Sequence, residues 1–207
     1  MASTATLRCW QCDHVASKSL LCSACGALQP PDRDYFRFFG LVEQLRIDPA
    51  YLQSRFYNLS RILHPDRYSR KSAKEQDFSL QATALLNDAY RTLRDPVARA
   101  EYVMKLHGLD IGEQRSKNVP AELLEEVFEL NEVLDELRNG DQDARPRLGE
   151  ELERFKEMRG EIDRELDHLF EQYDKTRRHE VLSHIRAVLN RRRYVSHLIE
   201  DVEKELG

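Results

Sequence analysis

Four cysteines, all within the first 25 residues, constrain the fold of this chain more than any other feature. Cys9 and Cys12 form one C-x2-C pair, Cys22 and Cys25 form a second, and nine residues separate the pairs. Two such knuckles place four thiolates tetrahedrally around one zinc ion and leave no open position for a substrate. A segment of about thirty residues buries too little surface to fold alone, so metal binding would supply the missing stability. The spacing predicts a structural zinc module over residues 1–31.

Other uses of the cysteines remain open. Two disulfides would use the same residues, although a cytosolic chain is kept reduced. A thioredoxin-like redox motif fits less well, because no strand–helix unit surrounds either pair. Zinc ribbons also bind nucleic acid, but Arg8 and Lys18 are the only cations of residues 1–31, and the whole chain carries a net charge of -5. We therefore expect no nucleic-acid partner.

The longest apolar runs are only a few residues, far below the roughly 20 needed to cross a bilayer, so we expect a soluble chain without membrane contact. Residues 1–8 have no apolar core and one basic residue. They fit neither a secretory signal nor a mitochondrial presequence, which predicts a cytosolic protein.

The rest of the chain reads as helical. Glycine and proline are sparse, with eight and seven residues, and apolar side chains recur at helical spacing. Short strands are expected only around the cysteines. After the break at Pro30-Pro31, capping residues and prolines predict helices over residues 34–41, 48–63, 72–93 and 95–108.

A segment without periodicity follows these four helices, and we assign residues 109–119 as a linker. Beyond it, three helices with short connections predict an antiparallel bundle. Their expected ranges are 120–140, about 146–174 and about 177–206. The fold class is all-α, with a zinc module (1–31), a four-helix domain (32–108), the linker (109–119) and a C-terminal bundle (120–207).

The tripeptide His64-Pro65-Asp66 lies between two long predicted helices that must pack antiparallel, so it is expected at the tip of their hairpin. Residues 46–74 contain seven cations and two carboxylates, a local charge of +5. A positive patch on an acidic chain favours an acidic protein partner. The alternative is an ordinary solvated turn that contains a proline.

Several further motifs accompany this loop. They are Asp34-Tyr35-Phe36, Phe39-Gly40-Leu41, His64-Pro65-Asp66-Arg67, Leu86-Asn87-Asp88-Ala89-Tyr90-Arg91-Thr92-Leu93, Arg99-Ala100-Glu101-Tyr102 and Lys105-Leu106-His107-Gly108. On these residues the sequence resembles a J-domain, the four-helix module that stimulates the ATPase of heat-shock chaperones of the DnaK class. It resembles most closely the HscB family of iron–sulfur cluster co-chaperones. The resemblance covers nearly the whole chain, including the cysteines of the zinc-bearing branch.

The resemblance implies that the loop triggers the partner ATPase. It assigns chaperone contacts to His64, Pro65 and Asp66, where Pro65 fixes the backbone and Asp66 offers an acceptor for an arginine. The predicted second helix departs from general J-domains, because Phe56-Tyr57-Asn58 stands where basic residues are usual. The remaining docking cations are then Arg55, Arg61 and Arg67.

The first bundle helix carries a second candidate surface. Residues 121–170 contain 17 acidic and seven basic side chains. Leu123, Val127, Leu130, Leu134 and Leu137 form a core stripe, and Leu124 and Phe128 lie on its flank, either as an exposed apolar patch or as part of a wide core. The family holds its IscU-type scaffold protein on this face, which implies scaffold contacts for Leu124, Phe128, Glu129, Glu132 and Tyr194. Glu125 departs from the apolar residue of a bacterial relative.

The sequence shows no phosphate loop and no nucleophile elbow, so we expect a co-chaperone and not an enzyme, with no nucleotide of its own. The resemblance implies two partners, a chaperone ATPase of the HscA/DnaK class and the scaffold protein, and leaves a homodimer open. The alternatives are a general J-domain co-chaperone for other clients and a zinc-ribbon nucleic-acid-binding protein. A bacterial chain would be cytoplasmic, and a processed eukaryotic chain would lie in the mitochondrial matrix.

Overall fold

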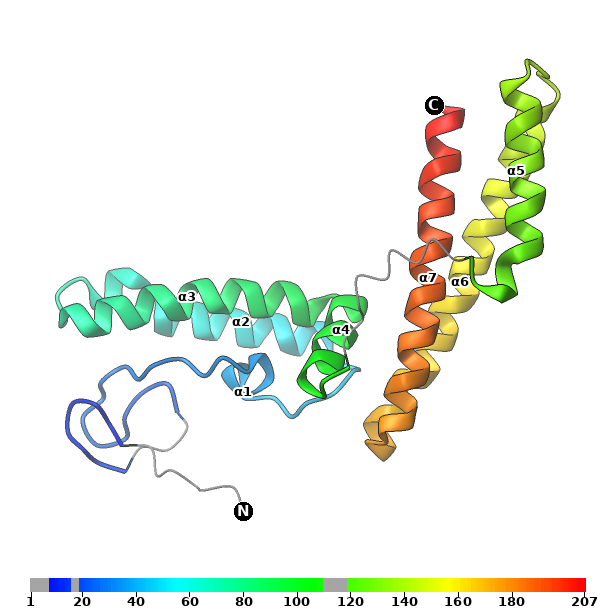
Figure 1. Cartoon of the computed structure of the whole chain (residues 1–207). Helices are drawn as coiled ribbons and strands as arrows, with labels where there is room; N and C mark the ends of the chain where they lie inside the picture. The colour runs from blue at the N-terminus through cyan, green and yellow to red at the C-terminus, as the bar shows by residue number, and fades with distance from the viewer. Residues whose placement is uncertain (1–7, 16–18, 110–118) are drawn as a thin grey trace. The chain divides into compact units, whose positions relative to one another are not determined.

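Helices account for almost all of the regular structure. The structure is a computed structural model that describes residues 8–15, 19–109 and 119–207 (Figure 1). Within these ranges, extended pairing is limited to the isolated bridges Arg8–Val15 and Leu21–Leu28. The all-α prediction is confirmed, and the strands expected near the cysteines are reduced to these bridges. Nearly all of the predicted linker lies outside the described residues.

The chain divides into two compact units, residues 1–99 and 100–207. The first holds the cysteine module, by which we mean the described residues 8–15 and 19–31, and a set of helices. These are α1 (Tyr35–Phe39), α2 (Pro49–Leu63), the 3-10 turn η1 (Pro65–Tyr68), α3 (Ala73–Arg94) and the first turn of α4 (Pro96–Leu106). The four-part domain division inferred from the sequence stays a prediction.

The helices of the first unit begin where capping residues predict. The Asp34 carboxylate accepts from the Arg37 N–H at 3.0 Å, and the Asp48 carboxylate accepts from the Ala50 N–H at 2.9 Å. The Ser72 hydroxyl accepts from the Glu75 N–H at 3.3 Å and opens α3. Each cap satisfies a backbone donor that the first turn of a helix leaves free.

The hairpin of α2 and α3 is held by an apolar seam. Leu52, Leu59 and Leu63 of α2 are buried, and with Phe56 they form a stripe in which apolar residues recur every three or four positions, the spacing of one helix face. Phe56, the remaining member of that stripe, stacks on Tyr90 of α3 with ring centroids 4.3 Å apart. This packing fixes the register of the two helices, and therefore the position of the loop between them.

A buried arginine ties the base of this unit together. Arg99, at the start of α4, is only 5% exposed. Its Nε donates to the Leu45 carbonyl at 2.8 Å, and its Nη1 donates to the Leu93 carbonyl. The loop between α1 and α2 and the end of α3 are thereby joined through one side chain.

Replacing Arg99 with alanine is expected to lower the free energy of unfolding by about 2–4 kcal/mol, because two buried carbonyl groups lose their donor. Urea unfolding followed by circular dichroism measures this change. Lys105→Ala is the control, since Lys105 is exposed on the same helix and should shift stability by less than about 0.5 kcal/mol. Equal stability of the two variants would contradict the role given to Arg99.

The second unit contains the predicted bundle. Its elements are the rest of α4, the 3-10 turn η2 (Ala121–Leu123), α5 (Leu124–Arg138), α6 (Ala144–Thr176) and α7 (His179–Leu206). Helices α6 and α7 pack against each other along their lengths, and α5 packs on α6 (Figure 1). Phe155, Leu166 and Ile185 are among the buried core residues. No described helix combines the length and the apolar character that a membrane crossing requires.

Candidate functional site

The four cysteines meet at one point, as predicted. Their sulfur atoms all lie within 4.8 Å of one another. The Sγ atoms of Cys9 and Cys25 are 3.7 Å apart, and those of Cys12 and Cys22 are also 3.7 Å apart. A tetrahedral ion with metal–sulfur bonds of about 2.3 Å places its ligands about 3.8 Å apart. The cysteines are free thiols at metal-ligand spacing and not disulfides.

Two matching turns build this cluster. In the first, the Cys9 N–H donates to the His14 carbonyl at 2.8 Å, and the Asp13 N–H returns to the Cys9 carbonyl at 2.9 Å. In the second, Cys22 makes the same pair of bonds with Ala27 and Gly26, both at 2.9 Å. The turn residues Asp13 (φ 58°) and Gly26 (φ 72°) are left-handed, which reverses the chain after each pair of cysteines.

The surroundings of the cluster favour ionisation of the Cys9 thiol and oppose ionisation of the Cys12 thiol. Burial works against ionisation of Cys9, but backbone N–H groups of Cys12 and Gln11 donate to its sulfur and lower its pKa from 9.0 to about 6. At Cys12, a hydrogen bond from the His14 backbone also lowers the pKa. Burial and the neighbouring sulfurs outweigh it and raise the pKa of this thiol to about 12. Four thiolates at this spacing therefore require a cation among them.

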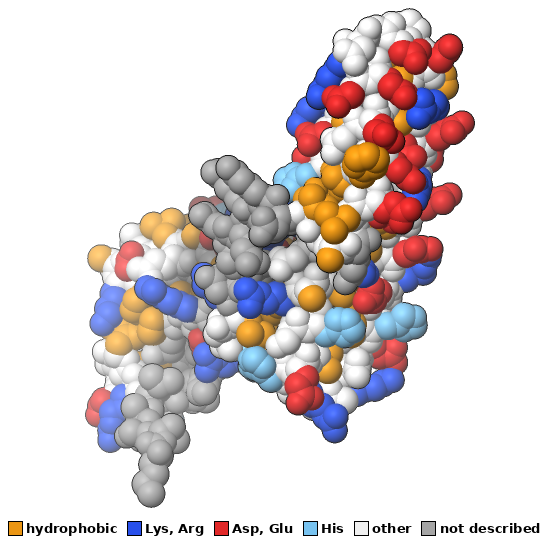
Figure 2. Space-filling model, turned by 45° about the vertical axis from the view of Figure 1, so that its right-hand side comes forward, with side chains coloured by type: hydrophobic (Ala, Val, Ile, Leu, Met, Phe, Trp, Pro, Cys, Tyr) orange, Lys and Arg blue, Asp and Glu red, His pale blue; other side chains and the backbone are white. Residues whose placement is uncertain are grey.

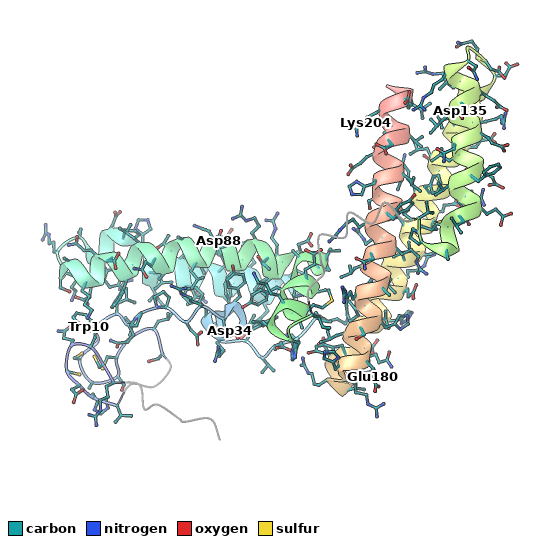
Figure 3. The ribbon with its side chains drawn as sticks, in the orientation of Figure 1. Trp10, Asp34, Asp88, Asp135, Glu180 and Lys204 are labelled. Carbon is teal, nitrogen blue, oxygen red and sulfur yellow. The ribbon has the colours of Figure 1, made fainter. Side chains whose placement is uncertain are left out.

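The cysteine module docks on the helical hairpin through Trp10, a contact that sequence reasoning missed. The Trp10 Nε1–H donates to the Leu28 carbonyl at 2.7 Å, which fixes the ring inside the module. The ring meets Phe78 of α3 edge to face at 6.1 Å, and the Lys74 ammonium lies 4.6 Å from its centroid. Figure 3 shows Trp10 beside the sulfur atoms of the module. The sequence did contain one signal for this contact, because Trp10, the one tryptophan of the chain, lies inside a C-x2-C pair.

The His64-Pro65-Asp66 loop lies at the end of the hairpin, and η1 forms within it. His64 ends α2, and its Nδ1 accepts from the Asp66 N–H at 3.3 Å. The side chains are 56% exposed at His64 and 90% exposed at Asp66, and Nδ1 lies 3.5 Å from the Asp66 carboxylate. The loop therefore presents both polar groups to solvent in a defined turn.

The backbone before the loop is fastened from α3. The Leu63 carbonyl, left free at the end of α2, accepts from the Ser79 hydroxyl at 2.6 Å and from the Thr83 hydroxyl at 3.3 Å. The Tyr68 hydroxyl donates to the Ile62 carbonyl at 3.1 Å. Carbonyl groups that a helix end leaves unpaired are thus satisfied by side chains, which orders the entry to the loop.

The three predicted docking cations differ in their surroundings. Arg61 and Arg67 are exposed beside the loop, and Arg67 Nη1 donates to the Arg61 carbonyl at 3.3 Å. Arg55 is half-buried, and its Nε and Nη2 donate to the Phe39 carbonyl at 2.9 and 2.6 Å. Two of the three nitrogens of the Arg55 guanidinium therefore donate hydrogen bonds to the C-terminal end of α1.

The α5 surface has the character of an exposed patch. Leu124 is 55% exposed and Phe128 is 64% exposed, whereas Leu123 and Leu130 of the neighbouring stripe are buried. This excludes the reading in which the two residues belong to a wide core. Figure 2 shows hydrophobic side chains gathered on one face of the second unit, next to many carboxylates.

The other predicted scaffold contacts lie in varied settings. Glu132 is exposed, and Glu129 pairs with Arg154 of α6 at 2.6 Å. Tyr194 is half-buried on α7, where burial raises the pKa of its hydroxyl. Helix α7 packs on α6.

Known proteins share this architecture. The family model described as the HSCB C-terminal oligomerisation domain matches residues 119–203. The crystal structure of human co-chaperone protein HscB superposes with a TM-score of 0.73 and 33% identity, over 96% of this chain and 98% of that one. Chaperone HscB from Vibrio cholerae matches with a TM-score of 0.57 and 28% identity, over 82% of this chain and 95% of that one.

Curated relatives agree with the structural matches. The iron-sulfur cluster co-chaperone protein HscB of Mus musculus is 41% identical over 133 residues, which cover 61% of this chain. The protein of the same name from Homo sapiens is also 41% identical, over 62% of this chain. The alignments span only 57% of the length of each of these two relatives. From the human structure, matched over nearly its full length, we conclude that this chain belongs to the HscB family of co-chaperones.

Proposed function

We propose that this protein is a co-chaperone of iron–sulfur cluster biogenesis. Its loop at His64-Pro65-Asp66 stimulates the ATPase of a heat-shock chaperone of the HscA/DnaK class. The bundle carries an IscU-type scaffold protein to that chaperone. The ATP chemistry belongs to the partner, and this chain acts by binding.

The observation that carries the proposal is the presentation of the loop. Asp66 is almost fully exposed, while the backbone just before the loop is fastened by Ser79, Thr83 and Tyr68. A preorganised exposed carboxylate suits the capture of a partner arginine, because little ordering entropy is lost on binding. The cations Arg61 and Arg67 beside it would draw an acidic partner surface toward the loop.

An ATPase assay tests the proposal. Steady-state hydrolysis by a DnaK-class chaperone is measured alone, with this chain, and with this chain plus the scaffold protein. We expect stimulation by the chain and a further rise when the scaffold is present. Stimulation without any scaffold effect would instead support a general J-domain co-chaperone, and a hydrolysis rate that this chain leaves unchanged would refute the proposal.

We propose zinc as the ion of the cysteine cluster. Four thiolates in a closed tetrahedral set suit Zn²⁺ and leave no coordination position for catalysis. Held by Cys9, Cys12, Cys22 and Cys25, the ion would join the two turns of the module and supply stability that its small core lacks.

Removing the metal with a strong chelator is expected to loosen the module alone. Trp10 should lose its contact with Phe78, so its fluorescence should shift to longer wavelength while the far-ultraviolet helical signal stays constant. Elemental analysis should find one zinc ion per four cysteines before chelation. A lower zinc content, or a loss of helical signal on chelation, would contradict this assignment.

The proposed compartment depends on the source of the chain. A bacterial member would act in the cytoplasm, and a processed eukaryotic member would act in the mitochondrial matrix.

A further inference from the structure

A cleft of about 890 Å³ lies between the cysteine module and the helical hairpin. The hairpin contributes an apolar part of its wall, formed by Leu59 and Ile62 of α2 and Phe78 of α3, together with the cations Arg55 and Lys74. Its opposite wall comes from the module and includes Trp10. Both walls belong to the first unit, so the cleft is formed within one compact part of the chain.

The polar lining of the cleft is strongly cationic. It contains five cations and a single carboxylate, that of Asp32. Arg8 is paired with Asp13, and Arg37 is paired with Asp32 and Asp34. The remaining cations are Arg33, Arg55 and Lys74, and no carboxylate of the described residues forms an ion pair with any of these three. The cleft thus has an uncompensated positive charge.

Two of these cations are held in place by neighbouring groups of the chain. Arg55 donates to the Phe39 carbonyl, and its Nη2 lies 2.8 Å from the position that a Cβ at residue 40 would take, so a side chain there would shift the guanidinium. Those bonds use Nε and Nη2, which leaves Nη1 for another acceptor. The Lys74 ammonium sits over the Trp10 ring, which restrains it while leaving it exposed.

We propose that this cleft binds an acidic peptide segment of a partner protein, with one bulky apolar side chain on the hairpin wall and carboxylates on Arg33, Arg55 and Lys74. The cations come from separate segments of the chain, so an extended peptide with several carboxylates can engage them together. A small ligand with one anionic group could not contact all three of these cations at once. Apolar anchors within a charged rim are a common arrangement at binding sites.

Single-stranded nucleic acid is the competing polyanion, and the aromatic geometry disfavours it. Binding of single strands relies on bases stacking on open aromatic faces. Here Lys74 lies over the Trp10 ring, and Phe78 meets that ring edge to face. The aliphatic wall of Leu59 and Ile62 suits an apolar side chain better than a base.

The test uses the full chain as purified and the peptide acetyl-DDLFDD-amide. Trp10 is the only tryptophan of the chain, so its fluorescence reports the cleft directly, and calorimetry provides a second readout. We expect saturable binding of this peptide, and at least tenfold weaker binding of acetyl-KKLFKK-amide and of acetyl-DDSSDD-amide.

Variants of the protein complete the test. The double variant Arg33→Gln/Lys74→Gln should weaken calorimetric binding of the acidic peptide about tenfold, because two surface charge contacts are lost. Arg70→Gln/Lys71→Gln removes two exposed cations that lie outside the cleft lining and should leave affinity unchanged. No saturable binding, equal affinity of both double variants, or tighter binding of a thymidine oligonucleotide at the same site would each overturn the proposal.

Discussion

Replacing Asp66 with alanine is expected to reduce chaperone ATPase stimulation to the basal rate. The Asp66 carboxylate is 90% exposed and lies 3.5 Å from Nδ1 of His64, which is itself 56% exposed, so the fold gains little from it. A carboxylate–arginine contact to a partner is worth about 2–3 kcal/mol, or about 30–150-fold in affinity. Hydrolysis measured over a range of co-chaperone concentrations shows whether the loss can be overcome at high concentration.

The matched control is Asp88→Ala. Asp88 is an exposed carboxylate of α3 that pairs with Arg91 on the same helix (Figure 3). That variant should stimulate the ATPase normally, and both variants should unfold at the same temperature and bind the scaffold protein equally. His64→Gln provides a second change in the loop and should also abolish stimulation. If the Asp66→Ala protein stimulates the ATPase as strongly as the wild type does, the loop does not act in stimulation as proposed.

The helices could be predicted from the sequence because each has a local signal at its start. Asp48-Pro49 and Ser72 fix the beginnings of α2 and α3, and those caps form as expected. The meeting of the cysteines could also be predicted, since the spacing of two C-x2-C pairs is itself a description of metal geometry. For Leu124 and Phe128 the sequence left an exposed patch and a wide core both open, and the exposure of the two side chains decides for the patch.

Contacts between distant segments could not be predicted in this way. Arg99 bonds to the Leu45 carbonyl across 54 positions of the chain, and no periodicity encodes such a pair. Arg55 looked like a free docking cation on α2, but the structure directs it to the end of α1, where Gly40 leaves space for it. The docking of Trp10 on Lys74 and Phe78 likewise depends on how the cysteine module lies against α3.

The variant Leu124→Ala/Phe128→Ala is expected to weaken binding of the scaffold protein by about 30-fold or more. Truncation of a large apolar anchor at the centre of an interface commonly costs about 1–2 kcal/mol or more, and two anchors are removed here. Both side chains are more than half exposed, so thermal stability should change little. Stimulation of the ATPase in the absence of scaffold should persist, because the loop lies in the other unit.

Calorimetry of scaffold binding measures this loss, and Leu80→Ala is the control because Leu80 is 60% exposed on α3 in the first unit. The matching family model is described as an oligomerisation domain, so sedimentation of the double variant distinguishes two uses of the patch. If the wild-type chain self-associates and the double variant does not, while scaffold affinity is unchanged, the patch joins copies of this chain. If scaffold affinity falls and the sedimentation coefficient stays the same, the α5 face holds the scaffold protein.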